Sequence, residues 1–433
     1  MFQKEFECME RSKLEELQLE RLKKLVFYVY ENVETYREKF DAIGFKPQDL
    51  TSLDQIASLP FTVKDDLRAA YPYKMFAAPQ KDIVRVHSSS GTTGQISVVG
   101  YTQNDLDMWS DCFARALSAA GLSNEDNIQV SYGYGLFTGG LGANDGVEKL
   151  GATVIPASGG NTQRQVQILR DFDIAAIACT PSYALHVGEA ARDMGVDVAS
   201  LPVRAGIFGA EPWTESMRDE LEKLFGIKAF DIYGLSEVMG PGVGYECEFQ
   251  RGLHINEDNF LIEIVDTETL LPVPDGEYGE VVFTTLTKEG IPLIRYRTRD
   301  ISRIIPEKCE CGRTFRRLER ITGRSDDMLI IRGVNVYPSQ IEDILLKMDG
   351  VAPHYQIVLD KRGSMDTVEV RVELEPHVAF DEIREIQKIT RSLKSAIASA
   401  LAISIDVKVV QPKSLTRSEG KIQRVIDLRA GKE

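Results

Sequence analysis

Apolar positions along the chain follow a helical pattern at the N-terminus and a strand pattern further on. Within residues 1–34 they recur at amphipathic helical spacing and predict a surface helix; these positions are Leu14, Leu17, Leu22, Val26, Val29 and Val33. From about 82 to 235, short apolar runs alternate with longer stretches of helical period, the runs being 83–86, 128–130, 152–156, 174–178, 205–208 and 229–233. This rhythm predicts a largely parallel sheet covered by helices.

The pattern changes twice in the second half of the chain. Alternating segments at 260–265 and 279–285, separated by Pro272, Pro274 and Gly276, predict antiparallel strands. After Gly323 we expect a helix following Pro338, strands at 355–359 and 368–374, a helix over 383–397 and a strand at 405–410. We therefore predict an α/β protein with a large N-terminal domain, residues 1–325, holding parallel and antiparallel sheets, and a small α+β C-terminal domain, residues 326–433.

Composition narrows the function classes. The 433 residues carry 51 Lys and Arg against 66 Asp and Glu, a net charge of −15, which disfavours nonspecific nucleic-acid binding. The apolar runs are far shorter than the ~18 residues that a membrane span requires, so we expect no membrane partner. Six cysteines are too few for a disulfide framework in a chain of this length, which favours a reducing, cytoplasmic setting.

The segment 88–94, Ser-Ser-Ser-Gly-Thr-Thr-Gly, combines five hydroxyls with two glycines between two apolar runs. Glycine permits close backbone approach, and hydroxyls with free amides form a set of donors that can surround phosphate oxygens. The segment lacks the Gly-Lys-Ser/Thr ending of a Walker loop. On composition alone a flexible Ser/Gly turn is an equal alternative.

Three further segments carry charged groups in positions that suit a nucleotide. Glu237 follows the apolar run 229–233 through a glycine turn, where a carboxylate can hold Mg²⁺ against phosphates or be a solvated turn residue. Asp300 and Arg324 can contact ribose hydroxyls and phosphate, or form an exposed ion-pair cluster. Lys421 lies in a glycine-flanked loop near the C-terminus, where a lone lysine usually serves solubility.

Taken in order along the chain, these segments resemble the adenylate-forming acyl-CoA synthetase superfamily over nearly the whole sequence. Within it, the segments 132–140 (YGYGLFTGG), 296–301 (YRTRDI) and 323–338 (GRSDDMLIIRGVNVYP) look like the phenylacetate–CoA ligase family. The resemblance implies a two-step reaction. An aryl carboxylate attacks the α-phosphate of ATP to give acyl-AMP and pyrophosphate, and the thiol of coenzyme A then displaces AMP.

The resemblance also implies roles for individual residues. The pyrophosphate cradle is formed by Ser89, Ser90, Gly91, Thr92, Thr93 and Gly94, of which Thr93 joins Glu237 and Lys421 in catalysis. The adenine lies against Gly209, Ala210, Glu211, Asp231, Ile232 and Tyr233, with Gly234 and Ser236 in the turn that leads to the Mg²⁺ contact Glu237. The ribose lies on Asp300, with Arg324 nearby. Gln95 stands where many relatives have a lysine, which leaves more of the phosphate charge to backbone amides and Mg²⁺.

By the same resemblance, the C-terminal domain is a mobile lid that rotates between the half-reactions, with Asp326 at the hinge. Lys421 then reaches the carboxylate and the α-phosphate only during acyl-AMP formation. After rotation, Gly333, Val334 and Asn335 come to the thiol entrance, where a glycine leaves space for the pantetheine arm. Family members are often dimers, so a homodimer is a further expectation.

The acyl pocket is predicted from aromatic residues. Tyr132, Tyr134 and Phe137, with the glycines around them, suit an aromatic-lined slot for a flat ring, and ordinary core packing explains them equally well. We identify no cation for a second acid group, which favours a monocarboxylate.

Cysteines suggest a separate feature in the antiparallel region. Cys247, His254, Cys309 and Cys311 supply three sulfurs and one imidazole, a set suited to a structural Zn²⁺. Unrelated reduced thiols are the alternative, because the gap of more than fifty residues is nonspecific.

Two other functions are open at this point. One is an adenylating enzyme that loads its acid onto a carrier-protein thiol or another acceptor. The other is a nucleotide-binding regulator without turnover, which the presence of both Glu237 and Lys421 disfavours.

Overall fold

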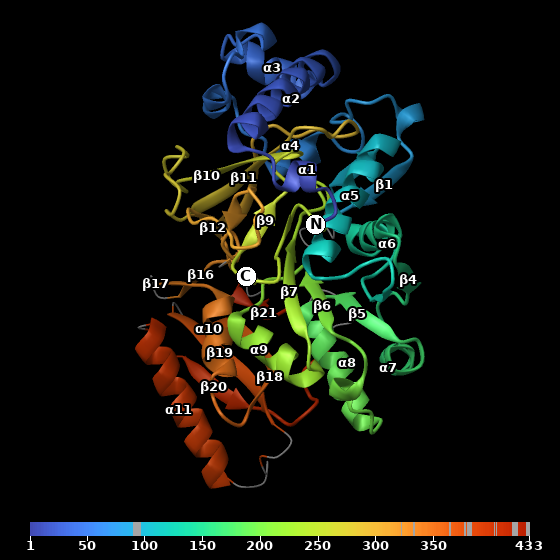
Figure 1. The fold of residues 1–433 in the computed structure, drawn as a ribbon. Helices are drawn as coiled ribbons and strands as arrows, with labels where there is room; N and C mark the ends of the chain where they lie inside the picture. Colours follow the sequence, from blue (N-terminus) through green and yellow to red (C-terminus); the bar gives the residue numbers. More distant parts are fainter. Residues whose placement is uncertain are drawn as a thin grey trace.

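The computed structural model describes residues 1–89, 97–321, 323–331, 334–362, 365–375, 378, 383–401, 403, 405–417 and 423–429. Figure 1 shows an upper body of helices and sheets and a smaller C-terminal part beside its lower end.

The N-terminal segment forms helices, as its apolar spacing predicts. They are α1 (Lys4–Glu7), α2 (Arg11–Asn32) and α3 (Glu34–Ala42), and the last two lie at the top of Figure 1. All of the predicted apolar positions are fully buried except Leu17, which is half-buried. Short helical segments follow at η1 (Pro47–Asp49), η2 (Leu53–Ser58), α4 (Lys64–Ala69) and η3 (Gln80–Asp82).

A nine-stranded sheet in the order β13-β14-β9-β8-β7-β6-β5-β3-β4 forms the centre of the upper body. Its parallel half, predicted from the apolar runs, is β3 (Asn127–Val130), β4 (Thr153–Pro156), β5 (Ile174–Cys179), β6 (Ala205–Gly209) and β7 (Lys228–Tyr233). Helices that connect or flank these strands are α5 (Gln103–Ala119), α6 (Thr138–Leu150), α7 (Thr162–Asp171), α8 (Pro181–Asp193), α9 (Glu215–Phe225) and the short η4 (Val198–Ser200). The predicted parallel, helix-covered sheet is therefore confirmed.

Antiparallel strands extend this sheet and build a second one. The extension is β8 (Gly244–Tyr245), β9 (Leu253–Ile255), β13 (Ile304–Ile305) and β14 (Arg317–Leu318), short strands that the sequence pattern did not single out. The second sheet contains β10 (Phe260–Val265), β11 (Gly279–Thr285), β12 (Tyr296–Ser302) and β15 (Gly323–Arg324), and its first two strands match the predicted ranges.

The hairpin β1 (Arg85–Ser88) and β2 (Val98–Tyr101) flanks the Ser/Thr/Gly segment. The strand expected at 83–86 lies two residues later. Val84 and Val86 are exposed, so the apolar character at the start of this run does not mark a buried strand.

The C-terminal part is an α+β unit with its own core, as predicted. Its four-stranded sheet has the order β20-β19-β18-β21, in β18 (Val351–Arg362), β19 (Met365–Leu374), β20 (Asp406–Val409) and β21 (Val425–Asp427). Helices α10 (Pro338–Leu346) and α11 (Ile383–Leu401) pack on it, and the hairpin β16 (Leu329–Ile331) and β17 (Val334–Val336) precedes it. In Figure 1 this part lies beside α8 and α9 of the upper body.

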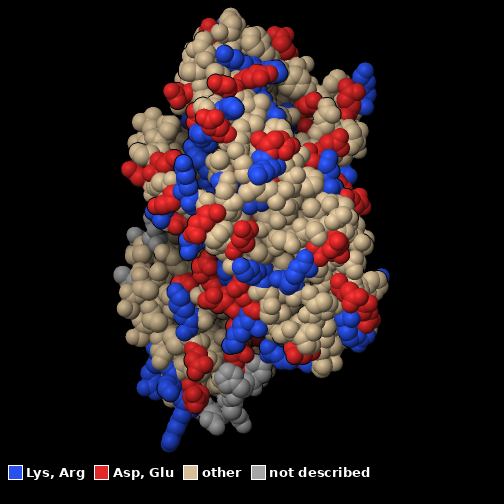
Figure 2. Space-filling model, viewed as in Figure 1, with Lys and Arg blue, Asp and Glu red and all other residues tan. Residues whose placement is uncertain are grey.

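Charge is mixed on the surface of the described residues. Acidic and basic side chains are interspersed over the face in Figure 2. Among the described helices none has the length and apolar content needed to cross a membrane.

Candidate active site

A cavity of about 210 Å³ opens at the carboxyl ends of β6 and β7. This is the edge at which α/β sheets place their ligands. Its walls come from segments far apart in the chain, and the lining residues are Lys64, Ser89, Tyr132, Phe137, Thr138, Gly139, Ala210, Glu211, Pro212, Trp213, Asp231, Ile232, Tyr233, Gly234, Leu235, Ser236, Glu237, Pro241, Asp300, Arg320, Ile321 and Arg324.

Tight turns after β6 and β7 bring the predicted adenine and metal residues to the cavity. A Cβ atom on Gly234 would lie 1.7 Å from the carbonyl oxygen of Gly240, so only glycine allows this turn to fold back on itself. Gly209 lies behind the wall, where its missing Cβ makes room for the carbonyl of Ile232. Glu211 lines the cavity and accepts a hydrogen bond at 2.9 Å from the backbone nitrogen of Ser182, at the start of α8.

Asp300 meets two partners at the cavity wall. The hydroxyl of Tyr233 donates to its Oδ2 at 2.5 Å, and Nη1 of Arg324 lies 3.3 Å from its Oδ1. The pairing of β12 with β15 sets Arg324 opposite Asp300, so the backbone register fixes this contact. Burial and the Asp300 carboxylate raise the pKa of Tyr233, which stays a neutral hydrogen-bond donor at physiological pH.

The Glu237 carboxylate is buried at the same cavity. Its Oε1 lies 3.2 Å from Nζ of Lys64, yet it accepts no well-aligned hydrogen bond from the described part of the chain. A buried carboxylate oxygen of this kind fits a hard divalent cation such as Mg²⁺. Lys64 belongs to α4, more than 170 residues earlier, and no motif around it identified it in the sequence.

Asp231 forms the deep wall with two residues that the sequence did not reveal. The indole Nε1 of Trp213 donates to Oδ1 of Asp231 at 2.9 Å, and the Arg320 guanidinium lies 4.5 Å from the centroid of the indole ring. Burial and the nearby Glu246 carboxylate raise the pKa of Asp231 to about 8. A protonated Asp231 adds a donor to this wall, which suits a heteroaromatic base with exposed acceptors.

Two of the three predicted acyl-pocket residues line the cavity. Tyr132 is buried with its hydroxyl 3.3 Å from the carbonyl of Ile207, and Phe137 is 40% exposed at the mouth. Tyr134 lies away from the lining that the described residues form, where its hydroxyl donates to Asn144 at 3.3 Å. Thr138 and Gly139, the first residues of α6, complete this side.

Several predicted residues fall outside the described ranges, namely Ser90, Gly91, Thr92, Thr93, Gly94, Gly333 and Lys421. Ser89 is described and lines the cavity, and its backbone nitrogen donates to the carbonyl of Ser97 at 3.0 Å. Val334 and Asn335 lie in β17 and do not belong to the cavity lining as described. Asp326, the expected hinge, accepts two hydrogen bonds from Arg324 at 2.8 and 2.9 Å.

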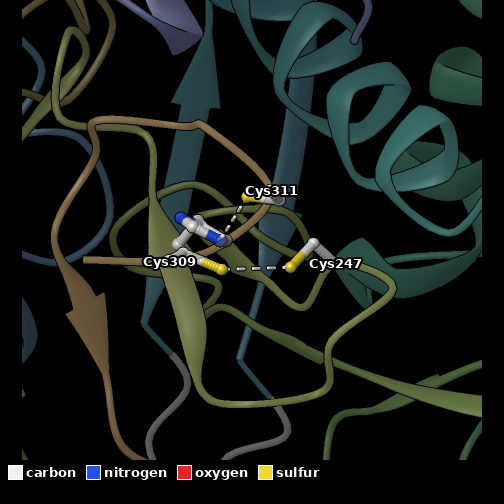
Figure 3. Close-up of side chains that lie close together, drawn as sticks. Cys247, Cys309 and Cys311 are labelled. Atoms are coloured by element: carbon white, nitrogen blue, oxygen red, sulfur yellow. Dashed lines mark hydrogen bonds between the residues drawn. The ribbon is translucent and has the colours of Figure 1, made fainter. Parts of the chain in front are cut away.

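The four predicted zinc ligands converge, and Figure 3 shows the three cysteine side chains close together. The ligand atoms of Cys247, His254, Cys309 and Cys311 all lie within 4.8 Å of one another. The Cys247 and Cys309 sulfurs are 3.6 Å apart, and the Cys311 sulfur is 3.5 Å from Nε2 of His254. A hydrogen bond from the Cys247 thiol holds the pKa of Cys311 well below its usual range, which favours the thiolate that metals bind.

Comparison with known proteins agrees with this geometry. Residues 24–286 match the family model described as AMP-binding enzyme, and residues 333–429 match the model described as AMP-binding enzyme C-terminal domain. The phenylacetate-coenzyme A ligase of Escherichia coli (strain K12) is 52% identical over 96% of this chain and 95% of that protein. The ligase of the same name from Thermus thermophilus is 48% identical over 99% of this chain and all of that protein.

A solved structure shows the same fold with a ligand. The 2-hydroxyisobutyryl-CoA ligase in its postadenylation state, in complex with R3-HIB-AMP, is 30% identical and aligns with a TM-score of 0.93 over 99% of this chain and 92% of that chain. Together with the matches to both AMP-binding models, this shows that the chain belongs to the phenylacetate–coenzyme A ligase family of AMP-binding enzymes.

Proposed function

We propose that the protein converts phenylacetate or a close aryl acid, with ATP and coenzyme A, into the aryl-CoA thioester, AMP and pyrophosphate. The observation that carries this proposal is the meeting of Asp300 and Glu237 on one cavity at the ends of β6 and β7. The two carboxylates have different surroundings and therefore suit different tasks. Tyr233 and Arg324 orient the Asp300 carboxylate, which can accept hydrogen bonds from hydroxyl groups. Oε1 of Glu237 is buried without a hydrogen-bond partner among the described residues and can bind a cation.

Different residues of the chain then contact different parts of the nucleotide. Adenine lies against the wall that contains Asp231, Ile232 and Tyr233, and its ribose hydroxyls donate to Asp300. Glu237 holds the Mg²⁺, which when bound neutralises charge on the phosphates. Ser89 marks the edge of the Ser/Thr/Gly segment that receives the pyrophosphate, and Lys64 supplies a cation on this side that compensates for Gln95.

The aryl acid occupies the side of the cavity formed by Tyr132 and Phe137. A flat ring packs favourably on these aromatic surfaces, and its carboxylate points back toward the phosphates. The exposed position of Phe137 at the mouth suits a residue that covers the ring after it enters.

Lys421 contacts the carboxylate and α-phosphate in the first half-reaction, and rotation of residues 326–433 relative to residues 1–325 prepares the second. The 2-hydroxyisobutyryl-CoA ligase in its thioesterification state aligns with a TM-score of only 0.72, against 0.93 for the postadenylation state. The arrangement seen here thus resembles the adenylation side of the cycle. We expect rotation to bring β17, with Val334 and Asn335, to the thiol entrance.

We also propose a structural Zn²⁺ on Cys247, His254, Cys309 and Cys311. Three sulfurs and one imidazole within 4.8 Å match a closed tetrahedral site. None of the six cysteines forms a disulfide, which agrees with the reducing, cytoplasmic setting that we propose. A homodimer remains part of the proposal on family grounds.

The decisive experiment measures pyrophosphate release with a panel of aryl, fatty and amino acids, with and without coenzyme A. We expect turnover with phenylacetate, and accumulation of thioester only when coenzyme A is present. Reaction restricted to fatty acids or amino acids contradicts the aryl assignment. Aryl-AMP formation without any transfer to coenzyme A favours a carrier-protein acceptor instead, and no turnover with any acid favours a nucleotide-binding regulator.

A further inference from the structure

Lys288 is a fully buried lysine that no part of the proposed reaction uses. It is 2% exposed and lies in the connection between β11 and β12. Its Nζ donates hydrogen bonds to the backbone carbonyls of Glu237 at 3.1 Å and of Val238 at 2.9 Å. Burial of an ammonium group costs free energy unless its donors are hydrogen-bonded, and these two carbonyls accept from Lys288.

One of the two carbonyls that Lys288 holds belongs to Glu237, whose carboxylate faces the cavity, and the other belongs to the next residue, Val238. We propose that Lys288 is a positioning residue that fixes the turn after β7 so that the Glu237 carboxylate presents its oxygen to the Mg²⁺ of the ATP complex. This inference rests on the proposed function only in assigning Mg²⁺ to Glu237. Groups behind a metal ligand usually act in this way, by fixing the ligand's orientation.

A second side chain holds the same turn from the same side. The hydroxyl of Tyr101 donates to the carbonyl of Met239 at 2.6 Å and lies 3.3 Å from that of Ser236. Nζ of Lys288 lies 4.8 Å from the centroid of the Tyr101 ring, and Trp109 stacks on the ring at 5.1 Å. Tyr101 ends β2, so this strand contributes a second support for the turn that contains Glu237.

The backbone that follows Lys288 is held in place by hydrogen bonds to Asp105. The backbone nitrogens of Glu289 and Gly290 donate to the buried Asp105 carboxylate at 2.7 and 2.8 Å. Asp105 sits in the first turn of α5 and also accepts from the nitrogen of Thr102 at 3.0 Å. The start of α5 thus fixes the backbone of residues 289–290, next to Lys288. The hydrogen bonds of Lys288 in turn restrict the turn that contains Glu237.

The test compares Lys288→Met, which removes the ammonium but keeps much of the volume, with Lys288→Arg, which keeps the charge and its donors. Binding of Mn²⁺ in place of Mg²⁺ to protein saturated with ATP is followed by electron paramagnetic resonance, with no acid present. Each half-reaction is then measured alone, the first from acid and ATP over a range of Mg²⁺ and the second from synthetic aryl-AMP and coenzyme A without metal.

We expect Lys288→Met to weaken Mn²⁺ binding and to slow acyl-AMP formation at limiting Mg²⁺ by about 10- to 100-fold, a range typical of groups behind a metal ligand. The second half-reaction should stay near the parent rate, and Lys288→Arg should recover much of the loss. The matched control is Arg37→Met, which also removes a cation from two backbone carbonyls, those of Tyr30 and Glu31, at the end of α2.

Unchanged Mn²⁺ affinity in Lys288→Met, or equal loss of both half-reactions, overturns the inference. If Lys288→Met does not fold, Tyr101→Phe removes the second pair of carbonyl contacts while keeping the ring, and must weaken Mn²⁺ binding in the same way. Because Mn²⁺ binding needs no acid, a parent protein that binds Mn²⁺ and ATP but activates no acid contradicts the proposed function and leaves the inference on Lys288 standing.

Discussion

Burial changes the chemistry of single residues in this cavity. Asp231 is an ordinary carboxyl in the sequence, but in the fold it lies against Trp213 with the Glu246 carboxylate nearby. Burial raises its pKa to about 8, so at neutral pH the folded protein retains a proton that the unfolded chain releases. Its contribution to stability is therefore complete below the pKa of an ordinary aspartate and is lost as the pH rises through about 8.

Replacement of Asp231 by Asn should remove this dependence, because the amide keeps the acceptor for the Trp213 indole and does not ionise. Between about pH 5.5 and 8.5 we expect the melting temperature of the parent protein to fall by at least roughly 2 °C more than that of Asp231→Asn. Differential scanning fluorimetry in matched buffers gives both curves. Parallel curves for the two proteins contradict a raised pKa at Asp231.

At the scale of elements, the cysteine cluster joins short antiparallel strands and loops that lie far apart in the chain. His254 lies in the three-residue β9, Cys247 follows the two-residue β8, and Cys309 and Cys311 lie in the loop between β13 and β14. These short antiparallel strands extend the central sheet on the side of β7. A metal bound by all four residues would stabilise that extension because it would link the segments that carry them.

Metal analysis of protein prepared without chelator should find about one zinc per chain. The double variant Cys309→Ser, Cys311→Ser should lose the zinc and unfold at lower temperature, with the nucleotide site affected only secondarily. Cys8→Ser is the control, because Cys8 contacts the carbonyl of Gly312 at 3.3 Å but is not one of the four ligands. Zinc-free parent protein with unchanged stability rules out the site.

At the scale of the whole molecule, a histidine–carboxylate hydrogen bond and an arginine ion pair join the C-terminal part to α8. Nε2 of the buried His354 in β18 lies 2.6 Å from the Glu189 carboxylate, and Arg417 bridges Glu189 at 3.4 Å and Glu373 at 2.8 Å. The arrangement that these contacts hold is the one that aligns with the postadenylation state of the related ligase. They must break if the C-terminal part rotates, so they bias the equilibrium between the two positions.

Glu189→Gln should weaken that bias by roughly 1 kcal/mol, or about fivefold in population. Acyl-AMP formation should slow accordingly in single-turnover measurements, while thioester formation from synthetic aryl-AMP should be unchanged or faster. Asp193→Asn is the matched control on the same helix, because its pair with Lys413 is exposed on both sides and is worth little. Equal slowing of both half-reactions by Glu189→Gln contradicts a position-specific contact.

Local signals in the sequence determined the elements and much of the site. Apolar runs such as 174–178 and 205–208 predicted buried parallel strands because such strands have both faces covered. Glu237, Asp231 and Asp300 were predicted from their positions in recognisable segments, and the structure brings all three to one cavity. The four zinc ligands were also predicted from composition, and their convergence is confirmed, while the zinc itself stays a prediction.

Only the tertiary structure decided which distant residues support that site. Lys64, Trp213 and Lys288 stand in segments without a motif, and their roles depend on the packing of α4, the turn after β6 and the β11–β12 connection around the cavity. The same holds for Tyr134, which shares a segment with Tyr132 and Phe137 but turns away from the cavity toward Asn144. A sequence pattern reports which face of an element is buried, because that depends on neighbours a few residues away. Which side chains meet across elements depends on packing between segments far apart in the chain, and that is set only when the whole molecule folds.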